Sequence, residues 1–287
     1  MIMSGTTWRR TGSIKYSAMN KKIAIIGGGN LGTAIAEGLI QSGFVTPKQI
    51  LITKRNIQTL NELERKGVLV SDRNEEAVRY ADLVILAVKP FQVSEILRSL
   101  KDEFRPDKHI LVSVVTGVSI DELSGCLGNK VGHGVPVVRA MPNTAISIQE
   151  SMTCIATRNV NDEHLQYIIE IFNQLGRAVR IDEKLMDAAT VLGACGTAFA
   201  MRYIRANIQG GIEIGFDAVT ASLIVAQTVK GAAELLLKKG THPEQEIDKV
   251  TTPKGCTIAG LNEMEHQGFS SSLIKGLVAS YEKIAKD

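Results

Sequence analysis

The stretch KIAIIGGGNLG at residues 22–32 decides the fold. Residues 22–26 form an apolar run that ends at a glycine, which is typical of a buried strand. Residues 30–43 have a helical pattern, so the glycines lie between a strand and a helix. Gly27 allows a tight turn, Gly29 lets the backbone approach a ligand, and Gly32 lets the helix pack close to the strand. The order strand, loop, helix predicts a site for a dinucleotide pyrophosphate at the helix N-terminus.

Outward from this stretch, apolar runs alternate with helical patterns. The runs at 50–53, 68–70, 82–88, 110–114 and 136–140 are apolar almost throughout, and a strand–helix–strand unit spans 152–181. Such runs are typical of a parallel sheet covered on both faces. After Asp182 the pattern is helical only, at 184–214, 217–239, 243–250, 257–267 and 271–286. The sequence predicts an α/β protein with a doubly wound parallel sheet at 21–182, followed by an all-α domain at 183–287.

Composition narrows the class of protein. The 287 residues are 44% hydrophobic and 22% charged, with a net charge of +3, which argues against nucleic acid or an acidic membrane surface as a partner. No apolar run approaches the roughly 20 residues that span a bilayer. The four cysteines are scattered, which favours neither a metal site nor a disulfide framework but a reducing cytoplasm. Residues 1–20 are expected to be a disordered extension. The alternative is that they come from an upstream start codon and that Met19 is the natural first residue.

The end of the second strand indicates which dinucleotide binds. An acidic residue there usually holds the ribose 2′-hydroxyl of NAD, and this chain has Thr53-Lys54-Arg55 instead. Two cations suit a 2′-phosphate, so we expect NADPH, with NADH as the alternative. Lys89 follows the fourth strand and could contact the ribose or phosphates. Each of these cations could also be an ordinary surface charge.

Several further motifs match one family. They are residues 87–90, 139–144, 182–188, 226–233 and, most specifically, 248–261, which read DKVTTPKGCTIAGL. From about Lys21 to its C-terminus the chain resembles pyrroline-5-carboxylate reductase. The resemblance implies a Rossmann domain followed by a helical dimerisation domain, and a cytoplasmic homodimer, with a decamer as the larger assembly. It also implies the last step of proline biosynthesis, the NAD(P)H-dependent reduction of 1-pyrroline-5-carboxylate to L-proline.

The resemblance also implies roles for individual residues. The substrate is expected to contact Glu183, Thr252, Gly255, Cys256 (through its backbone) and Thr257. Asn74 matches a family residue near the adenosine phosphate. With the motifs above, the expected cofactor site comprises Ile26, Gly27, Gly28, Gly29, Asn30, Leu31, Gly32, Thr53, Lys54, Arg55, Asn74, Ala87, Val88, Lys89 and Pro90. The chain departs from the family at Lys254, where Gly is usual, at Ala145, where Pro is usual, and at 194–199, where GSGPAY is usual.

Reduction of an imine asks little covalent chemistry of the protein, because the cofactor carries the hydride. We therefore expect no strong general base and no metal, and Thr257 is the candidate to hydrogen-bond the ring nitrogen. A helix beginning near Thr257 would offer free amides to the substrate carboxylate, or could be merely a well-capped helix. One alternative is a 3-hydroxyacid dehydrogenase of similar two-domain plan. Alcohol oxidation by such an enzyme needs a base, usually a lysine early in the helical domain, and residues 188–201 contain no lysine. The second alternative is a cofactor-binding protein without catalytic activity.

Overall fold

The structure is a computed structural model, and it describes residues 21–128 and 134–286. Side-chain burial is described as far as residue 284. The chain divides into two compact units between Ala194 and Cys195, and each unit is described by itself. This division falls twelve residues after the predicted boundary at 182/183 (194 − 182 = 12). The expected extension at 1–20 lies outside the described residues.

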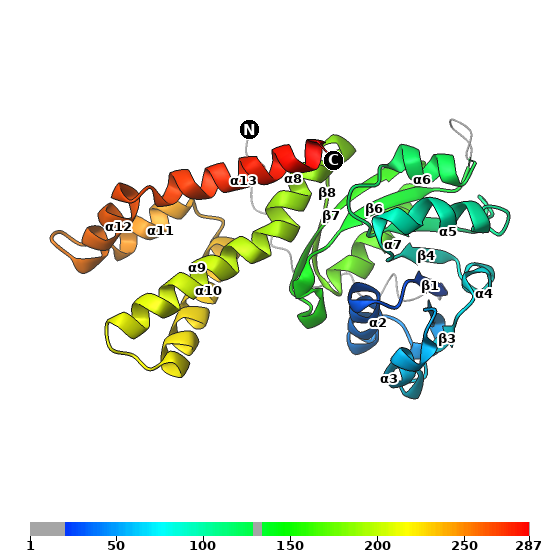
Figure 1. The fold of residues 1–287 in the computed structure, drawn as a ribbon, viewed down its shortest axis with the longest axis horizontal. Coiled ribbons are helices and arrows are strands. Elements are labelled where there is room, and N and C mark those ends of the chain that lie inside the picture. Colours follow the sequence, from blue (N-terminus) through cyan, green and yellow to red (C-terminus); the bar gives the residue numbers. More distant parts are fainter. Residues whose placement is uncertain (1–20, 129–133, 287) are drawn as a thin grey trace. The chain divides into compact units, whose positions relative to one another are not determined.

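The first unit contains an eight-stranded sheet with the order β3-β2-β1-β4-β5-β6-β7-β8. After β3 the chain crosses back, so that β4 pairs with β1 on the side away from β2. In dinucleotide-binding sheets ligands lie at such a switch point, beyond the carboxyl ends of the strands. Figure 1 shows the sheet edge with its helices on either side. The strands are β1 (Ile23–Ile26), β2 (Ile50–Thr53), β3 (Leu69–Ser71), β4 (Leu83–Leu86), β5 (Ile110–Ser113), β6 (Val137–Met141), β7 (Ser151–Arg158) and β8 (Gly176–Arg180).

The predicted doubly wound sheet is confirmed, with one difference in strand direction. Every described strand pair is parallel except β6 and β7, which run antiparallel with Val137 opposite Arg158. Parallel neighbours need a crossover of a dozen or more residues. The segment between Met141 and Ser151 is shorter than that and holds only the 3-10 turn η5 (Thr144–Ile148), so the chain turns back beside β6.

Helices cover both faces of the sheet, and each face has its own apolar core. On one face lie α2 (Asn30–Gln41), α3 (Asn61–Arg65) and α7 (Asp162–Asn173). On the other lie α4 (Asn74–Tyr80), α5 (Val93–Leu100) and α6 (Ile120–Cys126). Strands β1, β2, β4, β5 and β6 are buried along their whole lengths, which explains their continuous apolar sequences.

A long helical run joins the sheet to the second unit. It begins with η6 (Glu183–Leu185) and α8 (Met186–Ala189), widens into a π-helical turn, η7 (Thr190–Cys195), and continues as α9 (Gly196–Glu213). The remaining helices are α10 (Ala218–Lys239), α11 (Pro243–Val250), α12 (Cys256–His266) and α13 (Phe269–Lys286). The all-α prediction for this part is confirmed, and α12 begins one residue before the predicted start.

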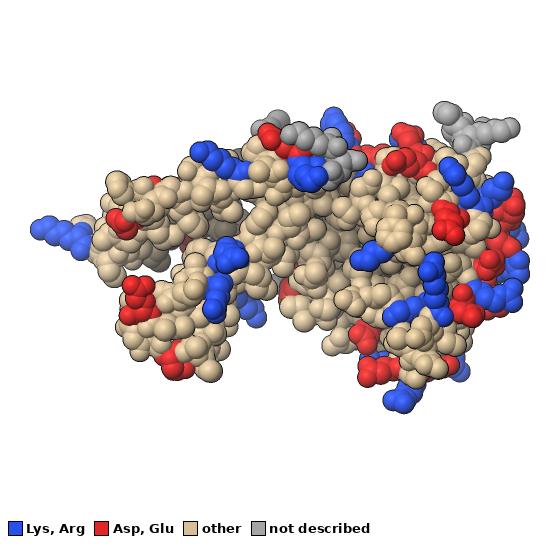
Figure 2. All heavy atoms as spheres, viewed as in Figure 1, with Lys and Arg blue, Asp and Glu red and all other residues tan. Residues whose placement is uncertain are grey.

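The second unit buries little of its own apolar surface. Among residues 195–284, Ala221 is the only fully buried side chain, and it faces Gly211 where α9 and α10 approach closely. Val219, Leu223 and Ile214 are between 71% and 80% exposed. Figure 2 shows that most of the visible surface of these helices carries no charge. One copy of this unit therefore lacks a core of its own.

Helix α10 corrects one expectation from the sequence. By length and composition it could cross a membrane, although no apolar run of that length was recognised in the sequence. Its average hydropathy is high over the whole helix. Small residues and residues with hydroxyl groups separate its larger apolar side chains, so the sequence shows no continuous run of large apolar residues.

Candidate active site

The glycine loop has the geometry that each glycine predicts. Gly27 has φ +111°, and a β-carbon there would lie 2.3 Å from the carbonyl oxygen of Ala87 at the end of β4. A β-carbon on Gly32 would lie 2.1 Å from the Gly27 carbonyl oxygen. A β-carbon on Gly29 would meet nothing within 4 Å, so the backbone there is open on the side where a ligand would approach. The loop therefore fits a dinucleotide pyrophosphate.

The N-terminus of α2 favours an anion. Gly29 is its N-cap and offers no side chain to its first amides, and the first turn contains no acidic residue. Free amides and the helix dipole attract phosphate at such an end. The amides of Gly27 and Gly28 donate to the Thr53 carbonyl oxygen at 3.2 and 2.7 Å, which ties the loop to the end of β2.

Residues at the end of β2 lie beside this loop. The Thr53 hydroxyl is buried and donates to the Asn74 amide oxygen at 2.6 Å, so Asn74 reaches this edge from the first residue of α4. Lys54 is half-buried and Arg55 is exposed, and neither has an ion pair with a described residue. These cations are available to a 2′-phosphate.

The end of β4 forms the other side of the loop. The Ala87 amide donates to the Ile26 carbonyl oxygen at 2.8 Å, and Val88 lies 3.0 Å from a β-carbon placed on Gly27. Lys89 is the N-cap of η4 (Pro90–Gln92) and is exposed. The structure thus brings the sequence-predicted cofactor residues of β1, β2, β4 and α4 to one edge of the sheet.

The loop at 252–257 of the most specific motif, called the signature loop from here on, lies in the second unit. Gly255 is the N-cap of α12, so Thr257 is the second residue of the helix and does not cap it. The Gly255 amide donates to the Thr252 carbonyl oxygen at 2.9 Å, and a β-carbon on Gly255 would lie 2.6 Å from the Thr252 hydroxyl oxygen. Lys254 has φ +60°, a conformation that favours glycine. The helix start therefore has no side-chain cap, and Thr257 in its first turn is half-buried.

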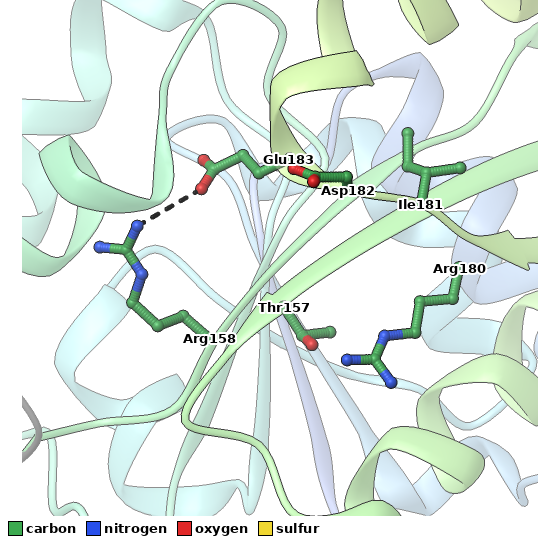
Figure 3. A pocket seen from close by; sticks show the side chains of 6 residues that line it. All are labelled: Thr157, Arg158, Arg180, Ile181, Asp182 and Glu183. Atoms are coloured by element: carbon green, nitrogen blue, oxygen red, sulfur yellow. Dashed lines mark ion pairs between the residues drawn. The ribbon is translucent and has the colours of Figure 1, made fainter.

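Glu183 is bound within the first unit. Its Oε1 accepts from the Ile120 amide at 2.6 Å and lies 3.5 Å from Nη1 of Arg139, which is 5% exposed. Its Oε2 lies 3.6 Å from Nη2 of Arg158, and Figure 3 shows these two side chains pointing toward each other. Arg158 also pairs with Asp121. These contacts give Glu183 a role in joining η6 to the start of α6.

A hollow of about 620 Å³ adjoins this cluster, and Thr157, Arg158, Arg180, Ile181, Asp182 and Glu183 line it (Figure 3). None of the residues that line the hollow belongs to the predicted cofactor site.

Two residues of the 139–144 motif have contacts that their sequence pattern did not predict. Arg139 is a buried cation on β6, and Asn143 follows the end of β6, where its amide nitrogen donates to the Gly193 carbonyl oxygen at 3.2 Å. The motif had marked the segment but gave neither residue a role. In the part of the chain that the structure describes, no group of three or more His, Cys, Asp or Glu side chains is placed to hold a metal ion.

The fold and the glycine loop define a Rossmann-type oxidoreductase. A family model described as "NADP oxidoreductase coenzyme F420-dependent" matches residues 22–117, and one described as "Pyrroline-5-carboxylate reductase dimerisation" matches residues 183–287. The chain belongs to the pyrroline-5-carboxylate reductase family.

Its relatives span several kingdoms. Pyrroline-5-carboxylate reductase 2 of Dictyostelium discoideum is 45% identical over 93% of each chain. Pyrroline-5-carboxylate reductase 1 of the same organism is 48% identical over 92% of this chain, but the match spans only 49% of that relative's length. The solved structure of a reductase from Coxiella burnetii aligns with a TM-score of 0.86 at 28% identity, over 93% of this chain and 98% of that one. The NADP-bound enzyme of Plasmodium falciparum aligns with a TM-score of 0.80 at 28% identity, over 92% and 97%.

Proposed function

We propose that this chain reduces 1-pyrroline-5-carboxylate to L-proline with NADPH, the last step of proline biosynthesis. Family membership supports the reaction, and the open glycine loop supports the cofactor. The observation that carries the proposal is that one chain has both that open loop in the first unit and an uncapped helix start in the signature loop of the second unit. One suits a pyrophosphate and the other a carboxylate.

The protein's contribution is to bind and orient. NADPH supplies the hydride when it is bound. The α2 N-terminus holds the pyrophosphate, and Lys54 and Arg55 hold the 2′-phosphate. The amides at the start of α12 hold the substrate carboxylate, and the Thr257 hydroxyl hydrogen-bonds the ring nitrogen.

The direct test is consumption of NADPH by the purified chain with pyrroline-5-carboxylate, with L-proline identified as the product. Thr257→Ala should lower kcat at least about tenfold while the Kd for NADPH stays within twofold, because the hydroxyl touches the substrate alone. Thr220→Ala, in exposed α10, is a control for loss of a helical threonine hydroxyl. Absence of turnover by the wild-type chain would favour a cofactor-binding protein without catalytic activity.

The preference for NADPH rests on Lys54 and Arg55. A charge-assisted hydrogen bond contributes about 1.5–3 kcal/mol, so replacing either residue by alanine should lower kcat/KM for NADPH about tenfold to a hundredfold, and replacing both should lower it further. The same parameter for NADH should change by less than threefold. Arg98→Ala, an exposed arginine on α5, is the matched control. Equal losses with both cofactors would refute the assignment.

We propose that the chain forms a homodimer in solution through its second unit, and that a decamer is the larger assembly. Its exposed apolar residues include Val219, Leu223 and Ile214, and a second copy of the same helices would bury them. The dimerisation family model covers these residues. This explanation also accounts for the apolar character of α10 without a membrane.

Sedimentation of the full chain should give at least twice its 31.0 kDa mass without detergent. Leu223→Glu should weaken this assembly, whereas Glu244→Gln, at an exposed position of α11, should not. A chain that stays in solution only with detergent would refute the dimer. All four cysteines are free thiols, which fits a reducing cytoplasm, and cell fractionation tests that location.

A further inference from the structure

Every polar group of Asn143 has a hydrogen bond, and its backbone carbonyl accepts from the Ile146 amide at 3.1 Å. Its backbone amide donates to the Ser151 hydroxyl at 3.0 Å, and its Oδ1 accepts from the Ala145 amide at 3.0 Å. Its Nδ2 donates to the carbonyl oxygen of Gly193 at 3.2 Å. The first three contacts fix Asn143 within the turn that follows β6. The fourth reaches fifty residues along the chain, to the π-helical turn η7.

The π-helical turn is buried at its start and more exposed after Val191. Met186, Thr190 and Val191 are buried in the first unit, and the Thr190 hydroxyl donates to the Met186 carbonyl oxygen at 2.9 Å. Leu192, the next residue, is 72% exposed. The bond from Asn143 therefore fixes the turn just past the point where burial stops. Such widened turns occur frequently at functional sites.

The chain passes into the second unit directly after Gly193 and Ala194. The signature loop at 252–257 belongs to that unit, so its path begins at a point that Asn143 holds. Asn143 itself follows the carboxyl end of β6, the edge of the sheet where ligands bind in this fold. One side chain thus joins the edge that takes the cofactor to the chain segment that leads to the substrate loop.

We propose that Asn143 is a positioning residue for hydride transfer, acting through the Gly193 carbonyl on the turn Thr190–Cys195. This inference rests on the proposed function. Hydride transfer depends steeply on the geometry of the reacting atoms, and a misplacement of 1 Å can cost about 100-fold in rate. Loss of the Nδ2 donor should therefore lower kcat and leave the affinity for the cofactor intact.

Asn143→Asp separates this role from a merely structural one. The aspartate keeps the acceptor for the Ala145 amide, but its second oxygen faces the Gly193 carbonyl and repels it. We expect kcat to fall at least about tenfold at pH 7.5. A protonated carboxyl group can donate to that carbonyl, and an acceptor neighbour in a half-buried site raises the pKa of an aspartate. The activity of Asn143→Asp relative to wild type should therefore rise as the pH falls.

Asn143→Ser is the second variant, since its hydroxyl can cap η5 but is too short to reach Gly193. It should lose kcat without the recovery at low pH. Asn207→Asp is the matched control, because Asn207 Nδ2 also donates to a carbonyl oxygen, that of Tyr203 at 3.0 Å, within an exposed helix. Its kcat should stay within twofold of wild type.

Three results from kinetics and cofactor binding would overturn the proposal. They are a kcat for Asn143→Ser within twofold of wild type, a relative activity of Asn143→Asp that is flat with pH, and a rise in the Kd for NADPH that matches the loss of kcat. Hydrogen exchange gives a readout independent of turnover. The amides of residues 190–197 should exchange at least about tenfold faster in Asn143→Ser than in wild type, and unchanged exchange refutes the link whether or not the chain reduces pyrroline-5-carboxylate.

Discussion

Lys254→Gly should stabilise the protein although it removes a side chain. Lys254 has φ +60° in the loop before α12, where the family usually has glycine. A residue with a β-carbon in the left-handed region costs about 1–3 kcal/mol. Glycine returns about 0.5–1 kcal/mol of this through its greater freedom in the unfolded chain. The expected net gain in the free energy of unfolding is therefore about 1 kcal/mol.

Urea unfolding followed by far-UV circular dichroism measures this gain, provided that the denaturant slope stays constant. Lys254→Arg keeps the β-carbon and the charge, and it should leave stability unchanged. Asn159 has φ 58°, but asparagine tolerates this region, so Asn159→Gly should change the free energy of unfolding by less than about 0.5 kcal/mol. These two variants separate backbone strain from charge and from the general effect of glycine.

Activity supplies a second readout of the same substitution. Because glycine is the usual family residue at this position, Lys254→Gly should keep kcat for pyrroline-5-carboxylate within about threefold. A lower free energy of unfolding for Lys254→Gly than for wild type would refute the strain argument. An equal gain from Asn159→Gly would refute it too, since the gain would then not depend on the residue that glycine replaces.

Three further predictions test individual contacts. Gly32→Ala should abolish NADPH binding, measured by calorimetry, because its β-carbon would lie 2.1 Å from the Gly27 carbonyl oxygen. Glu183→Gln should lower the free energy of unfolding by about 2 kcal/mol in urea titrations, since it leaves the buried Arg139 without its carboxylate. Burial, and then the charge of Lys108, lower the pKa of His109 below its usual 6.5. The unfolded chain therefore takes up this proton first, and the free energy of unfolding falls as the pH drops below 6.5. His109→Asn should make this fall smaller in urea titrations at several pH values.

Local patterns predicted most of the first unit. Residues 22–32 carry their own instructions, since an apolar strand, three spaced glycines and a helix are neighbours in sequence. The antiparallel direction of β7 could not be read from apolar runs, which look the same in either direction. The signal was the short segment between Met141 and Ser151, which leaves no room for a crossover.

Contacts between residues far apart in the chain could not be predicted from local sequence patterns. Glu183 matched a family motif, which suggested a place beside the substrate, but its partners Ile120, Arg139 and Arg158 lie 25 to 63 positions away. The bond from Asn143 to Gly193 spans fifty residues. The π-helical turn has no apolar pattern of its own, because one extra residue in a turn shifts the helix face without changing composition.

The difference in burial between the two units has a consequence for catalysis. The sheet unit has an apolar core on each face, whereas Ala221 is the only fully buried side chain among residues 195–284. A helical unit with so little core gains its stability from association, so its folding depends on protein concentration. The proposed substrate loop at 252–257 belongs to this unit, and the glycine loop does not. If the proposed homodimer forms, dilution should therefore reduce turnover before it reduces NADPH binding, because only the proposed substrate loop lies in the unit that depends on the partner copy.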